Sequence, residues 1–211
     1  MDYEKIFFYL QNLNENTQLK TFYDEVVGFE NIYFIPAIRF DVALFLNLIS
    51  FLKQPKNVLE IGFGSGVSAL FIQKDLISQE IFITLERDKK RYERGTRLLK
   101  KLENSTLNLL NLDAFDFFKQ NNNQFDLVFI DAVKKDYIDY FKIIKDRLNP
   151  NGIIICDNIF FNGKIIEENL PEKYEKGVAL LKEFNQTLSN DKSFFTQFLP
   201  IGDGISISIK K

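Results

Sequence analysis

The sequence predicts an α/β fold in which a mostly parallel sheet is covered by helices on both faces. From residue 57 onward, short apolar runs alternate with longer segments whose apolar residues recur at helical spacing. The expected strands are 57–61, 81–86, 106–112, 125–131 and 152–157, and the expected helices between them are 66–79, 88–103, 114–120 and 135–148. Pro150-Asn151-Gly152 is expected to form the turn after the last of these helices. This alternation is typical of the strand–helix–strand units that build parallel sheets.

The two ends of the chain differ from this alternating core. Residues 3–13 and 36–53 have apolar positions at helical spacing with no strand between them, so residues 1–55 are expected to form a helical N-terminal extension. Near the C-terminus, a helix from about 172 precedes two strand-like runs, 194–200 and 205–210. We therefore expect a single domain over 1–211, with 56–211 as its core and an antiparallel hairpin that ends the sheet.

The composition excludes several kinds of site. The 211 residues include no histidine, which rules out Ser-His-Asp and Cys-His nucleophilic systems and zinc sites that use histidine. A metal site would need oxygen ligands, which favour magnesium, calcium or manganese. The one cysteine, Cys156, is expected to be a buried, unreactive thiol. It cannot form an internal disulfide, and no signal peptide or membrane span is recognisable, so we expect a cytoplasmic protein.

A glycine-rich turn follows the first expected strand. In VLEIGFGSGVSAL, Gly62, Gly64 and Gly66 separate the strand from a helix, so that the backbone can approach a ligand closely. Glu86 ends the next strand, where a carboxylate can accept hydrogen bonds from both hydroxyls of a ribose. Together they favour a nucleoside site over a simple tight turn, although G-x-G-x-G is not the dinucleotide fingerprint. Asp113, at the end of the third strand, can equally cap the next helix or accept from an adenine amino group.

Polar side chains also end the next two strands. Asp131 ends the run 125–131, and Asp157 and Asn158 end the run from 152. Adjacent parallel strands finish at the same edge of a sheet, so these side chains are expected to converge. Two carboxylates and an amide oxygen suit a hard divalent cation, and helix capping is the alternative. Lys134 would then lie beside the cation, which favours a neutral amine that can act as a base; an ordinary surface lysine is the alternative.

The second expected helix has a basic face formed by Lys90, Arg94, Arg97 and Lys101. Most such faces are simply solvated, and an RNA-binding patch is the alternative. The formal net charge of -2 gives no general basic character that would favour RNA.

Taken together, these residues resemble the cation-dependent O-methyltransferases. These are class I S-adenosylmethionine-dependent enzymes that include catechol and caffeoyl-CoA O-methyltransferases and bacterial relatives. The resemblance runs from residue 57 to the C-terminus in family order, through VLEIGFGSGVSAL, TLERD, NLDAFDF, FDLVFIDAVKKDY, GIIICDNIFFNGKI, LKEFNQTLSNDKSFF and LPIGDGISISIKK. Its most specific part is the combination of Asp-x-x-Lys with Asp-Asn. It implies the Rossmann-like class I methyltransferase fold with seven strands, usually assembled as a homodimer.

The resemblance also implies roles for individual residues. The resemblance implies that the S-adenosylmethionine site is formed by Glu60, Gly62, Gly64, Gly66 and Ser68. Glu86 would contact the ribose, Asp113 and Ala114 would contact the adenine, and Asp131 would lie close to the cofactor. The resemblance implies that a divalent cation is held by Asp131, Asp157 and Asn158. Magnesium is expected first, with manganese or calcium as alternatives. Lys134 is implied as the catalytic base.

The sequence leaves the methyl acceptor open. The first hypothesis is a small catechol-like or phenolic hydroxyl compound. The stretch DNIFFNGKI also resembles bacterial members that methylate 5-hydroxyuridine in transfer RNA, which is the second hypothesis. A NAD-dependent oxidoreductase or a non-catalytic nucleotide-binding domain is the third. Two departures bear on the acceptor: Val133 replaces a second acid usual in the family, and residues 31–46 match the family poorly.

Overall fold

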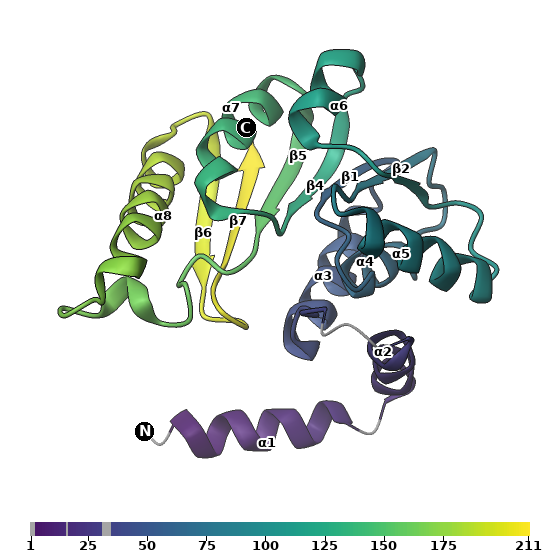
Figure 1. Ribbon diagram of the computed structural model, residues 1–211, viewed down its shortest axis with the longest axis horizontal. Helices are drawn as coiled ribbons and strands as arrows, with labels where there is room; N and C mark the ends of the chain where they lie inside the picture. The colour runs from purple at the N-terminus through teal and green to yellow at the C-terminus, as the bar shows by residue number, and fades with distance from the viewer. Residues whose placement is uncertain (1–2, 16, 31–34) are drawn as a thin grey trace.

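A seven-stranded sheet forms the centre of the computed structural model, which describes residues 3–15, 17–30 and 35–211 (Figure 1). The strands are β1 (Asn57–Ile61), β2 (Ile81–Leu85), β3 (Asn108–Leu110), β4 (Phe125–Ile130), β5 (Leu148–Cys156), β6 (Phe194–Leu199) and β7 (Ile205–Lys210). Their order across the sheet is β3-β2-β1-β4-β5-β7-β6. The first five strands pair in parallel, and β7 pairs antiparallel with both β5 and β6. The predicted fold class and C-terminal hairpin are therefore confirmed.

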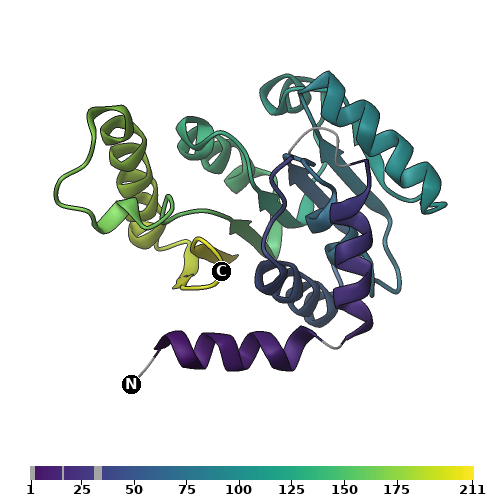
Figure 2. The same ribbon diagram turned by 60° about the horizontal axis from the view of Figure 1, so that its bottom comes forward.

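Helices cover both faces of the sheet. They are α1 (Tyr3–Glu15), α2 (Gln18–Gly28), α3 (Phe40–Lys53), α4 (Val67–Gln73), α5 (Lys89–Lys101), α6 (Ala114–Gln120), α7 (Tyr137–Asp146) and α8 (Glu172–Asn190). Helices α6, α7 and α8 pack on one face, and α3, α4 and α5 pack on the other, with α2 lying against α3 and α4. Helix α1 extends away from the rest of the protein in both views (Figures 1 and 2).

The parallel strands are largely apolar because both faces of the sheet are buried. In β4, Val128 and Ile130 pack with α6, α7 and α8, whereas Leu127 and Phe129 pack on the opposite face. Successive side chains of a strand point to opposite faces, so a strand buried on both sides needs an unbroken apolar run. This explains why the strand positions could be predicted from short apolar runs.

The strand order places a crevice above the middle of the sheet. The chain runs from β1 outward to β3 and then returns to β4 on the other side of β1. At such a reversal the loops after the two central strands diverge, which leaves an opening at their carboxyl ends. Backbone hydrogen bonds fix this edge, because the amide of Asp131 donates to the carbonyl of Ile61 at 3.0 Å.

Several boundaries differ from the expectation. The predicted helix 66–79 ends at Gln73, and the predicted strand 106–112 is reduced to β3. The Pro150-Asn151-Gly152 turn lies inside β5, where Asn151 has a φ of 57° and the register with β4 shifts. The turn residues therefore produce an irregularity within a strand instead of ending it.

Helix α2 was not predicted, and it changes the interpretation of the basic face on α5. Arg94 is buried, and its guanidinium donates to the carbonyls of Val26 at 3.2 Å and Phe29 at 2.7 Å at the end of α2. It also donates to the carbonyl of Ser65 in the glycine loop at 2.9 Å. The expectation of a solvated face is therefore wrong for Arg94, because the arginine joins the N-terminal extension to the loop after β1.

Two other members of this basic face also contact the N-terminal extension. Arg97 pairs with Glu30 at 2.7 Å, and Lys101 pairs with Glu25 at 3.2 Å.

Within the described ranges, no helix has the length and apolar character needed to cross a membrane.

Candidate active site

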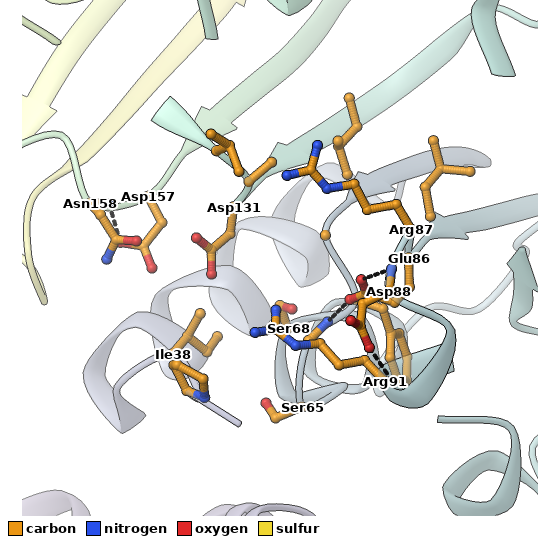
Figure 3. A pocket seen from close by; sticks show the side chains of 18 of the residues that line it. Ile38, Ser65, Ser68, Glu86, Arg87, Asp88, Arg91, Asp131, Asp157 and Asn158 are labelled. Atoms are coloured by element: carbon orange, nitrogen blue, oxygen red, sulfur yellow. Dashed lines mark hydrogen bonds between the residues drawn. The ribbon is translucent and has the colours of Figure 1, made fainter. Parts of the chain in front are cut away.

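A cavity of about 680 Å³ opens at the carboxyl ends of the parallel strands (Figure 3). Its walls come from the loops after β1, β2, β3, β4 and β5, the segment that precedes and begins α3, one residue of α7, and the β6–β7 turn. The predicted site residues that line it are Gly62, Gly64, Ser68, Glu86, Asp113, Ala114, Asp131, Asp157 and Asn158. The predicted site residues that do not line it are Glu60, Gly66 and Lys134. Most of the predicted residues are thus brought to one cavity, while their individual roles stay predictions.

Gly62 shows why the first loop needs glycine. Its φ is +103°, and a Cβ atom at this position would lie 2.0 Å from the carbonyl oxygen of Asp131. No side chain fits at that distance, and few residues other than glycine adopt this conformation. The backbone of the loop after β1 therefore packs directly against the end of β4, and the glycine loop and Asp131 lie next to each other at the cavity.

Glu60 lies beneath the glycine loop and is completely buried. Its carboxyl group accepts hydrogen bonds from the hydroxyls of Ser68 and Thr84. Burial raises the pKa of Glu60 to about 8, so the group is largely protonated at neutral pH. Ser68 lines the cavity, so Glu60 orients a wall residue from below.

Glu86 and Asp113 follow the ends of β2 and β3. The two carboxylate oxygens of Glu86 accept from the amides of Gly64 at 3.0 Å and Asp88 at 2.9 Å. A carboxylate has about four acceptor sites, so Glu86 keeps capacity for ribose hydroxyls while its orientation is fixed. Asp113 accepts from the amide of Phe115 at 2.9 Å and caps α6. Of the two alternatives for Asp113, capping is observed, and the adenine contact stays a prediction.

Asp131, Asp157 and Asn158 converge as the sequence predicts. Ile130 and Cys156 are register partners in β4 and β5, so the residues that follow them emerge at the same edge. Figure 3 shows the three side chains beside one another on one side of the cavity. Burial, and secondarily the negative charge of Asp131, raise the pKa of Asp157 to about 7. Cys156 itself is buried, and burial raises the pKa of its thiol to about 12, which makes it unreactive as expected.

The amine of Lys134 contacts this group from the side. Its Nζ donates to Oδ1 of Asn158 at 2.9 Å and lies 3.4 Å from Oδ1 of Asp131. It also donates to the hydroxyl of Tyr137 at 2.7 Å. Lys134 is therefore not an ordinary surface lysine, because its side chain is largely buried against the acidic group.

The chemistry of these donors fits a hard divalent cation. Over the described part of the chain, no three His, Cys, Asp or Glu side chains gather as a metal-binding group, and this set is instead two carboxylates with an amide oxygen. Oxygens of Asp131 and Asn158 both face the amine of Lys134, so they point toward a common position. A second carboxylate, Asp157, is buried beside them with a raised pKa, and a cation would favour its ionised form.

Sequence reasoning did not assign several individual residues of the cavity wall. From the N-terminal extension, the lining includes residues 36–39 and Val42; from the β6–β7 turn it includes Asp203. The carboxylate of Asp203 accepts from the amide of Asn162 at 2.7 Å, which fixes the loop after β5 to the hairpin. The third missed set, Arg87, Asp88 and Arg91, comes from the start of α5 and the residues before it. Two of these sets had a sequence signal. Residues 36–39 and Val42 lie in the stretch whose poor match to the family bears on the acceptor, and Arg87, Asp88 and Arg91 come soon after Glu86 at a strand end.

Comparison with known proteins assigns the chain to a family. The family model described as O-methyltransferase matches residues 8–211. The chain belongs to the O-methyltransferase family. It is 30% identical over 179 residues to caffeoyl-CoA O-methyltransferase 1 of Arabidopsis thaliana, covering 79% of this chain and 68% of the relative. It is 29% identical over 177 residues to catechol O-methyltransferase of Niastella koreensis, covering 79% of each.

A solved structure supports the same assignment. The SAH-bound methyltransferase PaMTH1 of Podospora anserina superimposes with a TM-score of 0.81 and 25% identity, covering 100% of this chain and 97% of that protein. The fold is therefore the Rossmann-like class I methyltransferase fold, and the chain is an S-adenosylmethionine-dependent O-methyltransferase. The oxidoreductase hypothesis is accordingly set aside.

Proposed function

We propose that this O-methyltransferase uses a divalent cation to methylate a hydroxyl of a small catechol-like or phenolic compound. The observation that supports it most is the group formed by Asp131, Asp157 and Asn158, with the amine of Lys134 in contact. The named activities of the caffeoyl-CoA and catechol relatives agree with such an acceptor. Magnesium is the cation we expect first, with manganese or calcium as alternatives.

Different residues of the chain would bind the cofactor, bind the cation and accept the proton of the acceptor. S-adenosylmethionine supplies an electrophilic methyl group, and the cation supplies a Lewis acid that favours an ionised acceptor oxygen. Glu86, Asp113 and the glycine loop would hold the cofactor, and the oxygens of Asp131, Asp157 and Asn158 would hold the cation. Lys134, in its neutral form, would accept the proton of the acceptor hydroxyl. Alignment within a shielded cavity supplies much of the remaining catalysis.

The acceptor would lie at the end of the cavity next to Asp157 and Asn158. Val133, Asn162 and Asp203 line the wall there together with the segment before α3. The carboxylate of Asp203 and the side chain of Asn162 offer hydrogen-bonding groups, while Val133 offers an apolar contact. A small aromatic ring with neighbouring hydroxyls matches this mixture.

Transfer RNA is the alternative acceptor, and one feature weighs against it. The basic face of α5 would be the natural candidate for backbone phosphates, yet Arg94 is buried and both Arg97 and Lys101 pair with acids of the N-terminal extension. A small acceptor is therefore the better supported proposal.

A homodimer in the cytoplasm is a further part of the proposal. Helix α1 exposes Ile6, Tyr9, Leu10 and Leu13, and α3 exposes Leu48, Phe51 and Leu52. Apolar side chains gathered on two helices support burial against a second copy. Sedimentation equilibrium should give twice the chain mass, and a monomer at all concentrations would contradict the homodimer.

An acceptor screen with isotope-labelled S-adenosylmethionine tests the function directly. Catechols, hydroxylated acyl-CoA esters and undermodified transfer RNA are compared, each with magnesium and with EDTA. We expect label in catechols or acyl-CoA esters only when magnesium is present. Label in transfer RNA alone would replace the small acceptor by RNA, and transfer that is indifferent to EDTA would refute the cation.

A further inference from the structure

Tyr137 is a buried residue that sequence reasoning did not assign to the site. It is the first residue of α7 and directly follows a 3₁₀ turn over Lys134–Asp136. Side chains three residues apart nearly eclipse one another in a 3₁₀ turn. This local geometry puts Tyr137 on the same side as Lys134 and explains their contact.

The hydroxyl of Tyr137 joins the ends of β4 and β5 to Lys134. It accepts from Nζ of Lys134 at 2.7 Å and from the amide of Ala132 at 3.4 Å. It is positioned to donate to the carbonyl of Asp157 at 3.2 Å or to that of Ile130 at 3.4 Å. The Ile130 carbonyl already accepts from the amide of Asp157 at 3.0 Å, so the Asp157 carbonyl is the better partner for the single phenolic proton.

Packing holds this hydroxyl in place. The ring of Tyr137 packs edge-on against Phe184 of α8, with centroids 5.3 Å apart, and Nζ of Lys134 lies 4.8 Å from the Tyr137 ring centroid. Burial raises the pKa of Tyr137 well above its usual value, so the hydroxyl keeps its proton and can both donate and accept. Tyr137 is accordingly a fixed point against which the lysine amine is aligned.

We propose that Tyr137 is the positioning residue for the base Lys134. The two shortest hydrogen bonds of Nζ are to Tyr137 and Asn158, so these two contacts set the position of the amine beside Asp131. Without the phenolic oxygen, one N–H loses its partner and the amine can rotate away from that alignment. The inference rests on the proposed role of Lys134.

The first test is Tyr137→Phe, which keeps the ring and its contact with the amine but removes the hydroxyl. We expect kcat with the best acceptor of the screen to fall by about 10- to 100-fold, because misplacing a catalytic group by about 1 Å can cost this much. The dissociation constant for S-adenosylmethionine should stay within about twofold, since the tyrosine does not line the cavity. Tyr92→Phe is the matched control, because Tyr92 lies on α5 outside the cavity lining and its change should leave kcat as it is.

A double-mutant cycle separates positioning from a merely structural role. In a Lys134→Met background, Tyr137→Phe should lower kcat no further, because the group it positions has been removed. An equal fractional loss in both backgrounds would overturn the proposal, as would an unchanged kcat in the single variant.

A second cycle does not depend on activity. Tyr137→Phe should shift the midpoint of chemical denaturation further in the wild-type background than with Lys134→Met, because one of the lost hydrogen bonds is to Lys134. Equal midpoint shifts in the two backgrounds would show that this contact is absent. If the wild-type protein methylates nothing in the screen, the proposed function fails, while this cycle still reports on the Tyr137–Lys134 contact.

Discussion

The buried carboxyl group of Glu60 should make the stability of this protein depend on pH. Its pKa is raised by burial from 4.5 to about 8, so the folded chain keeps a proton that the unfolded chain releases. The contribution of Glu60 is fully present below its unfolded pKa and is lost as pH rises through its folded pKa. From about pH 6 to about pH 8, linkage gives a loss of about 2 kcal/mol in the free energy of unfolding.

Glu60→Gln should remove that loss. An amide keeps a donor and an acceptor for the hydroxyls of Ser68 and Thr84 but does not titrate. Urea denaturation of both proteins in the presence of EDTA, at several values across this pH range, measures the difference. Asp157 also has a raised pKa, but it is present in both proteins and its contribution cancels. Identical pH slopes for the two proteins would refute the conclusion that Glu60 is protonated in the folded state.

Three further substitutions have defined outcomes. Gly62→Ala places a Cβ 2.0 Å from the carbonyl of Asp131, and strain and overpacking should each cost about 1–3 kcal/mol of stability in urea denaturation. Arg94→Met should lower the free energy of unfolding by about 2–4 kcal/mol, because buried carbonyls lose their hydrogen-bond donor. It should also weaken cofactor binding in calorimetry, because one of these carbonyls belongs to Ser65 in the glycine loop. Arg97→Met, at an exposed position of the same helix, is the control and should change neither quantity. Lys134→Met should lower kcat by about 10²–10⁴-fold without weakening cofactor binding, and an unchanged kcat would exclude it as the base.

The convergence of Asp131, Asp157 and Asn158 could be predicted because it depends on local rules. Apolar runs locate the strands, a parallel sheet aligns their carboxyl ends, and the polar residues that follow must then meet at one edge. The register partners Ile130 and Cys156 show that the two strands end level. The same reasoning brought Glu86 and Asp113 to the cavity.

Arg94 and the N-terminal extension could not be placed by such rules. Helix α2 had a usable signal, since Leu19, Phe22, Tyr23 and Val26 recur at helical spacing, but nothing in the sequence indicates where that helix docks. The partners of Arg94 lie up to 68 residues away along the chain. Whether an arginine is solvated or buried depends on such tertiary contacts, and its position on a helix face alone does not decide it.

Asp203 illustrates the same limit in a loop. It lines the cavity because the β6–β7 hairpin pairs antiparallel against β5, which brings the turn to the carboxyl end of the parallel strands. The hairpin was predicted, but the edge at which its turn would lie was not. The acceptor end of the site depends on this turn and on the segment before α3, which is why the sequence left the acceptor open.

We propose that methyl transfer at this site needs a divalent cation held by Asp131, Asp157 and Asn158. The most direct test is the rate of labelled methyl transfer to the best acceptor by chelator-treated protein as magnesium is titrated back. We expect a rate near background without magnesium that rises to saturation as the site fills. A chelator-treated protein that transfers methyl groups at the full rate before any magnesium is added would contradict it.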